Sequence, residues 1–250
     1  MKNMLQEQFS ARYHELDPQN RVRCTVLLAW LQEAAVAHAS QLGVSVEALA
    51  DRGLAWVISR LALQLERQVK GSEPVTVSTW PFSREGRFSI RDFRITARDG
   101  TLIGAATTSW AAITLDTRRP VRIDQSLPEY PVRSERALDD RFEPLPEMDS
   151  PLYCVDMPVL KSCLDLNGHV NNTVYPGWAV ESLPMELTRN SSLERIEINF
   201  RGEALYGDFV RSSSMPEPQA QGNSYIHRIE RVENSQELCR LRTVWKMACN

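Results

Sequence analysis

The sequence contains very little lysine. Lysine stands only at positions 2, 70, 161 and 246, so 29 − 4 = 25 of the 29 basic residues are arginine. These arginines are interspersed with acidic residues, the net charge is −3 and the isoelectric point is about 5.9. A nucleic-acid-binding domain carries instead a basic stripe and a pI above about 9. We therefore attribute the arginine bias to genome composition and expect no nucleic-acid partner.

Long hydrophobic runs and a secretion signal are also absent. No segment approaches the roughly 18 uninterrupted apolar residues of a membrane span, and residues 1–10 lack the apolar block of a secretory signal. With 11 glycines and 14 prolines among 250 residues, the chain is not collagen-like or of low complexity. We expect a soluble cytoplasmic protein with no membrane span, of one large domain or two of about 100 to 130 residues.

Cysteine is scarce and irregularly spaced. The cysteines are odd in number, lack a Cys-x-x-Cys pair and are spread along the chain, at Cys24, Cys154, Cys163, Cys239 and Cys249. This pattern suits reduced thiols better than a disulfide framework or a zinc site. No metal ion or organic cofactor is expected.

The sequence does contain an internal repeat. Residues 17–22 align with residues 165–170 at an offset of 148, and the same offset places Trp30 on Trp178 and Glu33 on Glu181. Further along the chain the offset falls to 134–136, in the pairs Leu65-Glu66-Arg67 with Asn199-Phe200-Arg201, Gly71 with Gly207, and Trp110 with Trp245. The difference, 148 − 135 = 13, predicts about 13 additional residues in the first copy, within 41–56.

Both copies predict the same succession of elements. An approach strand (9–16 and 153–158) leads to a polar turn and an amphipathic helix. The first helix is predicted at 25–42; the second begins near Asn172 or Thr173, either of which can cap it, and ends at Pro184. Four strand-like segments then follow, at 56–67, 75–82, 88–97 and 103–114 in the first copy and at 195–201, 208–213, 224–231 and 238–247 in the second.

A proline-rich segment separates the copies. Residues 128–151 hold five prolines among many charges, a composition typical of a linker. We predict a first domain at 1–127, a linker at 128–151 and a second domain at 152–250. Because one helix followed by about four strands is an α+β unit in which an antiparallel sheet wraps the helix, two copies predict two sheets packed as a pseudo-dimer.

Common catalytic motifs are missing. The sequence has no Gly-x-Ser-x-Gly, phosphate-binding loop, Gly-x-Gly-x-x-Gly or His-Glu-x-x-His, which gives no support to a serine esterase, nucleotide hydrolase, dinucleotide enzyme or zinc peptidase. A catalytic histidine must be His14, His38, His169 or His227. His14 and His38 are expected at surface or hydrogen-bonded structural positions.

The densest group of polar residues surrounds His169, in Asp165-Leu-Asn-Gly-His-Val-Asn-Asn172. If this segment is extended, Asp165, Asn167 and His169 point to one side, with the N-terminus of a helix behind them. The alternative is an Asx-rich turn whose side chains only bond the backbone and cap the helix. Since the first copy has Gln19 and Arg21 at the positions of Asn167 and His169, a reactive site is expected in the second copy alone.

Residues 165–184, Asp-Leu-Asn-Gly-His-Val-Asn-Asn-Thr-Val-Tyr-Pro-Gly-Trp-Ala-Val-Glu-Ser-Leu-Pro, closely resemble the signature of plant and bacterial acyl-acyl carrier protein (acyl-ACP) thioesterases. The first half resembles the N-terminal half of that family through Tyr13-His-Glu-Leu-Asp17, Leu31-Gln-Glu-Ala34 and Trp56-Val-Ile-Ser-Arg60. The resemblance therefore covers nearly the whole chain. The Gly-His-Val-Asn-Asn core also occurs in single-domain hot-dog thioesterases that act on coenzyme A esters.

The resemblance implies two tandem hot-dog domains, each a long helix wrapped by an antiparallel sheet, with the catalytic residues in the C-terminal half and the acyl pocket mainly in the N-terminal half. It implies hydrolysis of fatty acyl-ACP to free fatty acid, which ends chain elongation in fatty acid biosynthesis. It matches the catalytic residues of the family to Asp165, Asn167, His169 and Glu203. Plant members carry a cysteine after that glutamate, and Ala204 at this position excludes a covalent mechanism through it.

We expect water to attack the thioester carbonyl. Either Glu203 or His169 acts as general base while the other orients it, which is worth about 10² to 10⁴ in rate. Asn167 holds the water or the carbonyl, and Asp165 fixes the loop. Direct attack by Asp165 through an anhydride stays open.

An acyl chain needs an apolar pocket, and the first helix with the additional residues 41–56 supplies candidate lining. The candidates are Leu42, Val46, Leu49, Trp56 and Ile58. The expected partner is acyl carrier protein, which is acidic and could be steered by surface arginines. These are Arg118, Arg119 and Arg122, or Arg195, Arg201 and Arg211. A monomer and a homodimer are both compatible with a tandem repeat.

Three other functions stay open: an acyl-CoA thioesterase, a hot-dog dehydratase or hydratase that acts on the acyl chain, and an acyl-binding protein without turnover. A dehydratase would release an enoyl thioester rather than a free acid.

Overall fold

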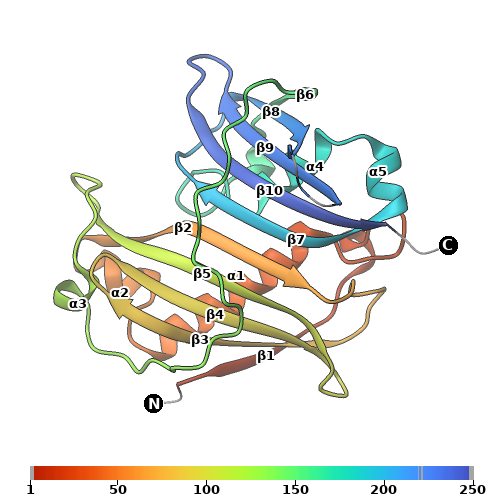
Figure 1. The fold of residues 1–250 in the computed structure, drawn as a ribbon. Coiled ribbons are helices and arrows are strands. Elements are labelled where there is room, and N and C mark those ends of the chain that lie inside the picture. Colours follow the sequence, from red (N-terminus) through yellow and green to blue (C-terminus); the bar gives the residue numbers. More distant parts are fainter. Residues whose placement is uncertain (1–2, 219, 221, 248–250) are drawn as a thin grey trace.

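The computed structural model describes residues 3–218, 220 and 222–247, and ten strands within them form one antiparallel sheet (Figure 1). The strand order is β1-β3-β4-β5-β2-β7-β10-β9-β8-β6. The first half supplies β1 (Leu5–Phe9), β2 (Leu54–Leu65), β3 (Val75–Glu85), β4 (Phe88–Ala97) and β5 (Leu102–Thr114). The second half supplies β6 (Tyr153–Pro158), β7 (Ser191–Phe200), β8 (Phe209–Pro216), β9 (Asn223–Arg231) and β10 (Glu237–Met247).

The two halves share this sheet, so the expectation of two separate sheets is wrong. Strand β2 pairs with β7 from Arg60↔Asn199 to Gln64↔Arg195. The central pair, Ala62↔Glu197, joins positions 197 − 62 = 135 apart. This separation equals the repeat offset of the strands, so equivalent strands meet at a pseudo-two-fold axis. The α+β fold class and the tandem hot-dog arrangement are confirmed.

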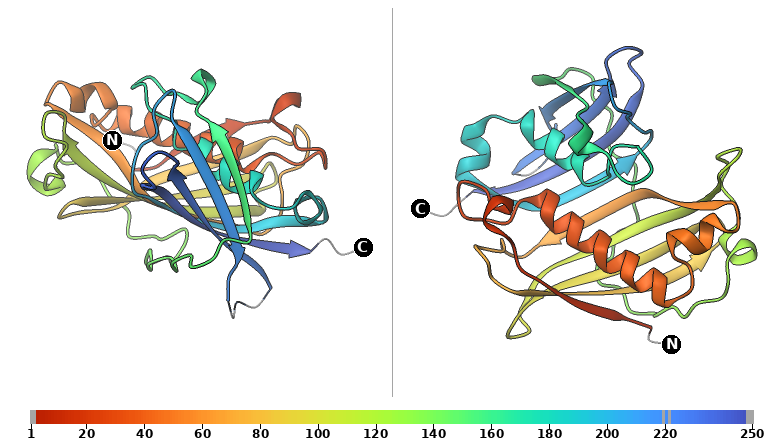
Figure 2. Two further views of the ribbon diagram at one scale, coloured as in Figure 1. Left: turned by 90° about the horizontal axis from the view of Figure 1, so that it is seen from above. Right: turned by 180° about the vertical axis from the view of Figure 1, so that it is seen from behind.

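The long helices lie on one face of the sheet (Figure 2). Helix α1 (Cys24–Gln41) lies across the first half and contacts α4 (Val174–Glu181) of the second half. Their apolar sides and the facing sheet form one core that runs through both halves and includes Leu31, Leu63, Phe93, Tyr175 and Ile196. The sheet alternates: on β4, Phe93 and Ile95 enter this core, whereas Asp92, directly before Phe93, points to the opposite face.

A bulge in β2 keeps that alternation in register. The pairing with β5 shifts between Ile58 and Arg60, so Ser59 is an extra residue. Ile58 and Leu61 therefore both enter the core, although they are three positions apart.

Several predicted boundaries need correction. The first strand covers Leu5–Phe9 rather than 9–16, because residues 13–15 form a 3-10 helix before the turn. The second helix is much shorter than α1 and ends at Glu181, while Pro184 caps α5 (Met185–Asn190). Neither Asn172 nor Thr173 caps α4 with its side chain; Asn171 Oδ1 instead accepts the Thr173 N–H at 3.0 Å. The additional residues of the first copy contain α2 (Val46–Ala50).

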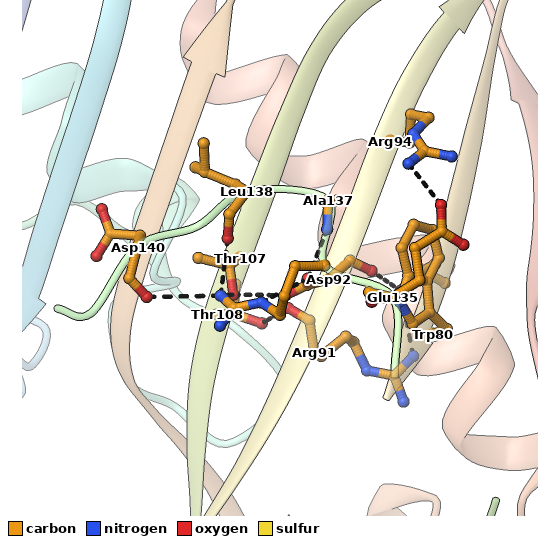
Figure 3. Close-up of polar contacts among 12 residues, drawn as sticks. Trp80, Arg91, Asp92, Arg94, Thr107, Thr108, Glu135, Ala137, Leu138 and Asp140 are labelled. Atoms are coloured by element: carbon orange, nitrogen blue, oxygen red, sulfur yellow. Dashed lines mark hydrogen bonds and ion pairs between the residues drawn. The ribbon is translucent and has the colours of Figure 1, made fainter. Parts of the chain in front are cut away.

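The predicted linker lies against the face of the sheet opposite to the helices. After α3 (Ile123–Ser126), residues 128–151 contain no helix or strand. Asp92 anchors the segment: its carboxylate accepts the Ala137 N–H at 2.8 Å and pairs with Arg136 at 3.0 Å (Figure 3). Farther along, Arg240 donates to the carbonyls of Leu145 and Pro146 at 3.2 and 3.1 Å. The segment is therefore attached to both halves.

The described cysteines, Cys24, Cys154, Cys163 and Cys239, form no disulfide bond. Cys249 lies outside the described residues.

Candidate active site

Residues 165–169 form a tight turn, so the expectation of an extended segment is wrong. Asp165 Oδ1 accepts the backbone N–H groups of Asn167 and His169 at 2.8 and 3.3 Å. Gly168 has φ +77°, which closes the turn at little steric cost. The backbone N–H of Asp165 also donates to the His169 carbonyl at 2.8 Å. This is the Asx turn considered as the alternative, and it fixes where His169 stands.

The first copy contains the same turn with different side chains. Asp17 Oδ1 accepts the N–H groups of Gln19 and Arg21, both at 2.9 Å, and Asn20 has φ +60° at the position of Gly168. Because both copies use the aspartate in this way, the aspartate has a structural role, which is to hold the turn closed. The differences that bear on chemistry therefore lie at two other positions of the turn, where Asn167 and His169 correspond to Gln19 and Arg21.

Glu203 is placed opposite His169 by backbone pairing. His169 forms a β-bridge with Leu205, and the Val170 N–H donates to the Ala204 carbonyl at 3.1 Å. On the buried side, the Ala204 N–H donates to Tyr175 Oη at 3.0 Å. Burial raises the pKa of Tyr175, so its hydroxyl stays neutral. Two loops of the second half thus meet with their polar residues side by side.

The geometry brings an imidazole, a carboxylate and a guanidinium together. His169 Nε2 lies 3.6 Å from Glu203 Oε2, and Arg118 pairs with the same carboxylate oxygen. The side chains of His169 and Glu203 are 29% and 42% exposed, so both can reach a substrate. Arg231 Nη2 donates to the Glu203 carbonyl at 2.8 Å and fixes the backbone. A pair of this kind can take a proton from water and orient it.

Asn167 stands at the exposed tip of the turn. Among the described residues its side-chain amide makes no hydrogen bond, and only its backbone N–H is used. The amide is therefore available to a bound molecule.

Two narrow apolar cavities extend from this region into the first half. The first, of about 20 Å³, is lined by Asn172 and Thr173, close behind the turn, and by Ala35 and Trp110 of the first half. The second, of about 70 Å³, shares Ala35 and Trp110 with the first and continues toward Tyr130. We call these two cavities together the channel. It runs from the loop of the second half along α1.

The predicted pocket residues divide between the channel and a separate core. Ile58 lines the first cavity, and Val46 and Trp56 line the second. Leu42 and Leu49 line neither cavity; they pack in a small core that includes Val44 and Tyr130, which do line the second cavity.

The channel also contains a buried guanidinium that was not expected from the sequence. Arg91 lines the cavity that continues toward Tyr130 and is only 8% exposed. Arg91 Nη1 lies 3.0 Å from Nδ1 of the buried His38. Burial lowers the pKa of Arg91 to about 10, so the guanidinium remains charged at neutral pH. The alternation of β4 could have indicated that Arg91 points inward with Phe93.

Arg118 is the other residue whose place the sequence does not reveal. It was a candidate for steering a partner, and it lies in the turn after β5 with φ +54°, against Glu203. By contrast, Arg195, Arg201 and Arg211 are paired with Asp140, Glu237 and Asp156.

In the described part of the chain, no cluster of three or more histidine, cysteine, aspartate or glutamate side chains is arranged to hold a metal ion. No helix there is long and apolar enough to cross a membrane.

A tandem hot-dog sheet with an acid–histidine pair beside an apolar channel defines a hot-dog protein suited to acyl thioesters. The family models agree with that class: residues 2–130 match the acyl-ACP thioesterase N-terminal domain, and residues 154–247 match the acyl-ACP thioesterase C-terminal domain. The chain belongs to the acyl-ACP thioesterase family.

Named relatives are similar over nearly all of the chain. Oleoyl-acyl carrier protein thioesterase 2 of Arabidopsis thaliana is 27% identical over 279 residues, which cover 96% of this chain and 76% of the relative. An acyl-[acyl-carrier-protein] hydrolase of Cuphea viscosissima is 26% identical over 255 residues, covering 95% of this chain and 60% of the relative. Both relatives are described as chloroplastic.

Solved structures show the same fold. An acyl-ACP thioesterase from Bacteroides thetaiotaomicron has a TM-score of 0.83 and 26% identity, over 98% of both chains. The 12:0-ACP thioesterase from Umbellularia californica has a TM-score of 0.86 and 21% identity, over 99% of both chains, which supports the fold alone.

Proposed function

We propose that this chain hydrolyses the thioester bond of fatty acyl-ACP and releases the free fatty acid, which ends chain elongation. The observation that carries the proposal is the His169–Glu203 pair, whose two loops continue into Asn172 and Phe200 of the channel lining. Family membership supports the same reaction.

The pair acts on a water molecule. One member of the His169–Glu203 pair removes a proton from water while the other holds it in the correct orientation, and the hydroxide adds to the thioester carbonyl. The tetrahedral intermediate then expels the thiolate, which takes the proton back. The exposed Asn167 amide orients the carbonyl or the water. The products are one fatty acid and one thiol.

Asp165 acts as a positioning residue in this proposal. Its Oδ1 already accepts two backbone N–H groups, at 2.8 and 3.3 Å, as Asp17 does in the copy that has Arg21 at the position of His169. An anhydride mechanism would require Asp165 to attack while it holds the turn, so the water mechanism is favoured.

The acyl chain enters the channel and lies along α1. Ile58, Val46 and Trp56 are its proposed contacts. Leu42 and Leu49 act indirectly: Leu49 belongs to α2 and packs with Leu42 in the small core that holds this helix in place. The depth of the channel then sets the preferred chain length.

The proposed partner is acyl carrier protein. Arg118 and Arg119 are exposed in the turn after β5, and Arg118 already touches Glu203. An acidic carrier bound there would bring its thioester to the pair. We also propose a cytoplasmic protein that works as a monomer or a homodimer, with domains at 1–127 and 152–250 and a linker at 128–151.

Thiol release from a panel of acyl-ACP esters, short to long, tests the reaction. His169→Ala and Glu203→Gln should each lower kcat by about 10² to 10⁴. The matched controls are His14→Ala and Glu66→Gln, which change exposed residues of the first half and should keep native rates. Equal rates in His169→Ala and native protein would refute the site.

Product analysis separates the other functions. Free acid as the product supports hydrolysis, whereas an enoyl thioester would identify a dehydratase, and tight binding without either product an acyl-binding protein. Faster release from coenzyme A esters than from carrier esters would make acyl-CoA the substrate.

A further inference from the structure

A third cavity, far larger than the channel, lies on the other side of the pseudo-two-fold axis. It encloses about 600 Å³ between the turn of the first half and helix α4, against about 20 and 70 Å³ for the two parts of the channel. We call it the second cavity site; it is separate from both cavities of the channel. Its volume is within the range of about 300–1,000 Å³ that is typical of small-molecule sites.

The second cavity site is the counterpart of the channel in the other copy. Its lining residues map onto channel residues by the repeat offsets. At the offset of 148, Cys24, Thr25, Val180 and Leu183 correspond to Asn172, Thr173, Gln32 and Ala35. At the offset of 135, which the pairing of β2 with β7 fixes, Leu193 and Trp245 correspond to Ile58 and Trp110, and Leu65 corresponds to Phe200 rather than to Asn199. The same walls therefore surround both spaces. The second space is wider because α4 ends at Glu181, well short of the length of α1.

The acid–histidine pair of the second half has no equivalent in the second cavity site. Arg21 replaces His169, and its guanidinium is occupied by Asp17 at 2.7 Å and by the carbonyls of Thr188 and Ser191 at 2.9 and 2.5 Å. Gln68 stands where Glu203 stands in the second copy and donates to the Leu193 carbonyl at 2.5 Å. No acid–base pair remains at this position.

A thiol nucleophile is absent as well. Burial raises the pKa of Cys24, which lines the cavity, to about 11, so the thiol stays protonated. The second cavity site is therefore built to hold a molecule and not to cleave one.

The charges at the second cavity site favour an anionic ligand. Arg23 and Arg189 line it and are exposed, whereas the exposed acid of the lining is Glu181. Asp17 is already paired with Arg21. The lining also has an apolar part, which includes Leu183, Leu193 and Trp245. Arg23 and Arg189 have exposed guanidinium groups, of which that of Arg189 contacts, among the described residues, only the Met185 thioether, at 3.7 Å. An apolar wall with two such groups at its border fits a chain with one carboxylate.

We propose that the second cavity site binds a free long-chain fatty acid, with its chain against Leu183 and Trp245 and its carboxylate at Arg23 and Arg189. The choice of ligand rests on the proposed function, because a fatty acid is the product of that reaction. The binding itself requires no catalysis and can be measured apart from it.

Equilibrium dialysis with labelled palmitate tests the number of sites. Native protein is compared with Ala35→Trp, which fills the channel, and with Val180→Trp, which fills the second cavity site from α4. Ala35→Trp should still bind one palmitate per chain, and adding Val180→Trp should abolish that binding. Loss of palmitate binding in a folded Ala35→Trp protein, judged by an unchanged Tm, would overturn the proposal.

A charge variant that spares the core covers the case in which a tryptophan prevents folding. Arg23→Glu with Arg189→Glu changes only exposed side chains and should weaken palmitate binding at the second cavity site about tenfold. Arg52→Glu with Arg141→Glu, two exposed arginines outside the lining, is the matched control and should bind as the native protein does. Equal affinities in the two double variants would contradict the proposed place of the carboxylate.

A crystal soaked with an ω-brominated fatty acid locates the ligand directly. Anomalous signal between α4 and the first turn supports the proposal, and signal in the channel alone, or none, overturns it. Thiol release measured in parallel keeps the two proposals distinct: a protein that hydrolyses esters but shows no ligand in the second cavity site refutes only this inference. A protein that binds palmitate there but cleaves no ester refutes only the proposed function.

Discussion

His227 on β9 should limit the stability of the fold in acid. The side chain is completely buried, and its Nε2 lies 2.8 Å from Thr243 Oγ1. Thr243 Oγ1 also accepts the indole N–H of Trp245 at 2.9 Å, so its own hydrogen is free to point at the imidazole. A hydrogen bond from this hydroxyl to Nε2 suits the neutral form of the imidazole. Burial accordingly lowers the pKa of His227 from 6.5 to about 3.

The cost of acidification follows from proton linkage. Between pH 6.5 and about 3, the unfolded chain binds a proton at His227 that the folded chain does not bind. The free energy of unfolding therefore falls by about 1.4 kcal/mol for each pH unit in that interval. Above pH 6.5 the contribution is complete, and at about pH 4.5, two units lower, about 2.7 kcal/mol is lost.

Urea denaturation at about pH 7.5, 6.5, 5.5 and 4.5 measures this loss. Native protein is compared with His227→Gln, whose amide can still bond Thr243 but has no proton to gain, and with His14→Gln as an exposed control. His227→Gln should start less stable at pH 7.5 and lose less on acidification, so its curve approaches the native one. Parallel curves for the native protein and His227→Gln would refute the reasoning, since other carboxylates act equally in both.

Three further changes test other parts of the structure. Ala35→Trp closes the channel and should abolish hydrolysis of long acyl-ACP esters while short esters are still cleaved, as thiol release will show. Gly104→Ala would place a Cβ 2.7 Å from the Gln64 carbonyl oxygen, so urea denaturation should find it less stable by about 1 to 3 kcal/mol, more than Gly177→Ala, whose Cβ meets only Thr25 at 3.2 Å. Raising the ionic strength from about 0.05 to about 0.5 M should raise KM for carrier-protein esters more than for uncharged pantetheine esters, because the proposed arginine contacts are screened.

Local patterns predicted much of the fold. The spans predicted for β4 and β6 have the bounds observed, and α1 differs by one residue at each end. These elements are set by neighbouring residues, through alternation or helical spacing. The joining of the halves into one sheet could not be predicted, because it depends on the edges of β2 and β7, whose residues are more than a hundred positions apart.

At the candidate site, too, local patterns predicted some features, and contacts between distant parts of the chain could not be predicted. The repeat indicated that His169 and Arg21 are equivalent positions, which the matching turns around Asp165 and Asp17 confirm. The contact of Arg118 with Glu203 was not predictable, since it brings the turn after β5 to a loop of the other half. A period-two pattern also cannot tell an extended loop from a turn closed by Gly168.

The fusion of the two copies into one sheet has a consequence for how such a protein can diverge. In a symmetric dimer of identical chains, each substitution appears on both sides of the axis, so a change that suits one site must be tolerated at the other. In this chain Arg21 and Gln68 occupy one side while His169 and Glu203 occupy the other. Each side of the axis can therefore change alone: one carries an acid–histidine pair, and the other carries a wider cavity without such a pair.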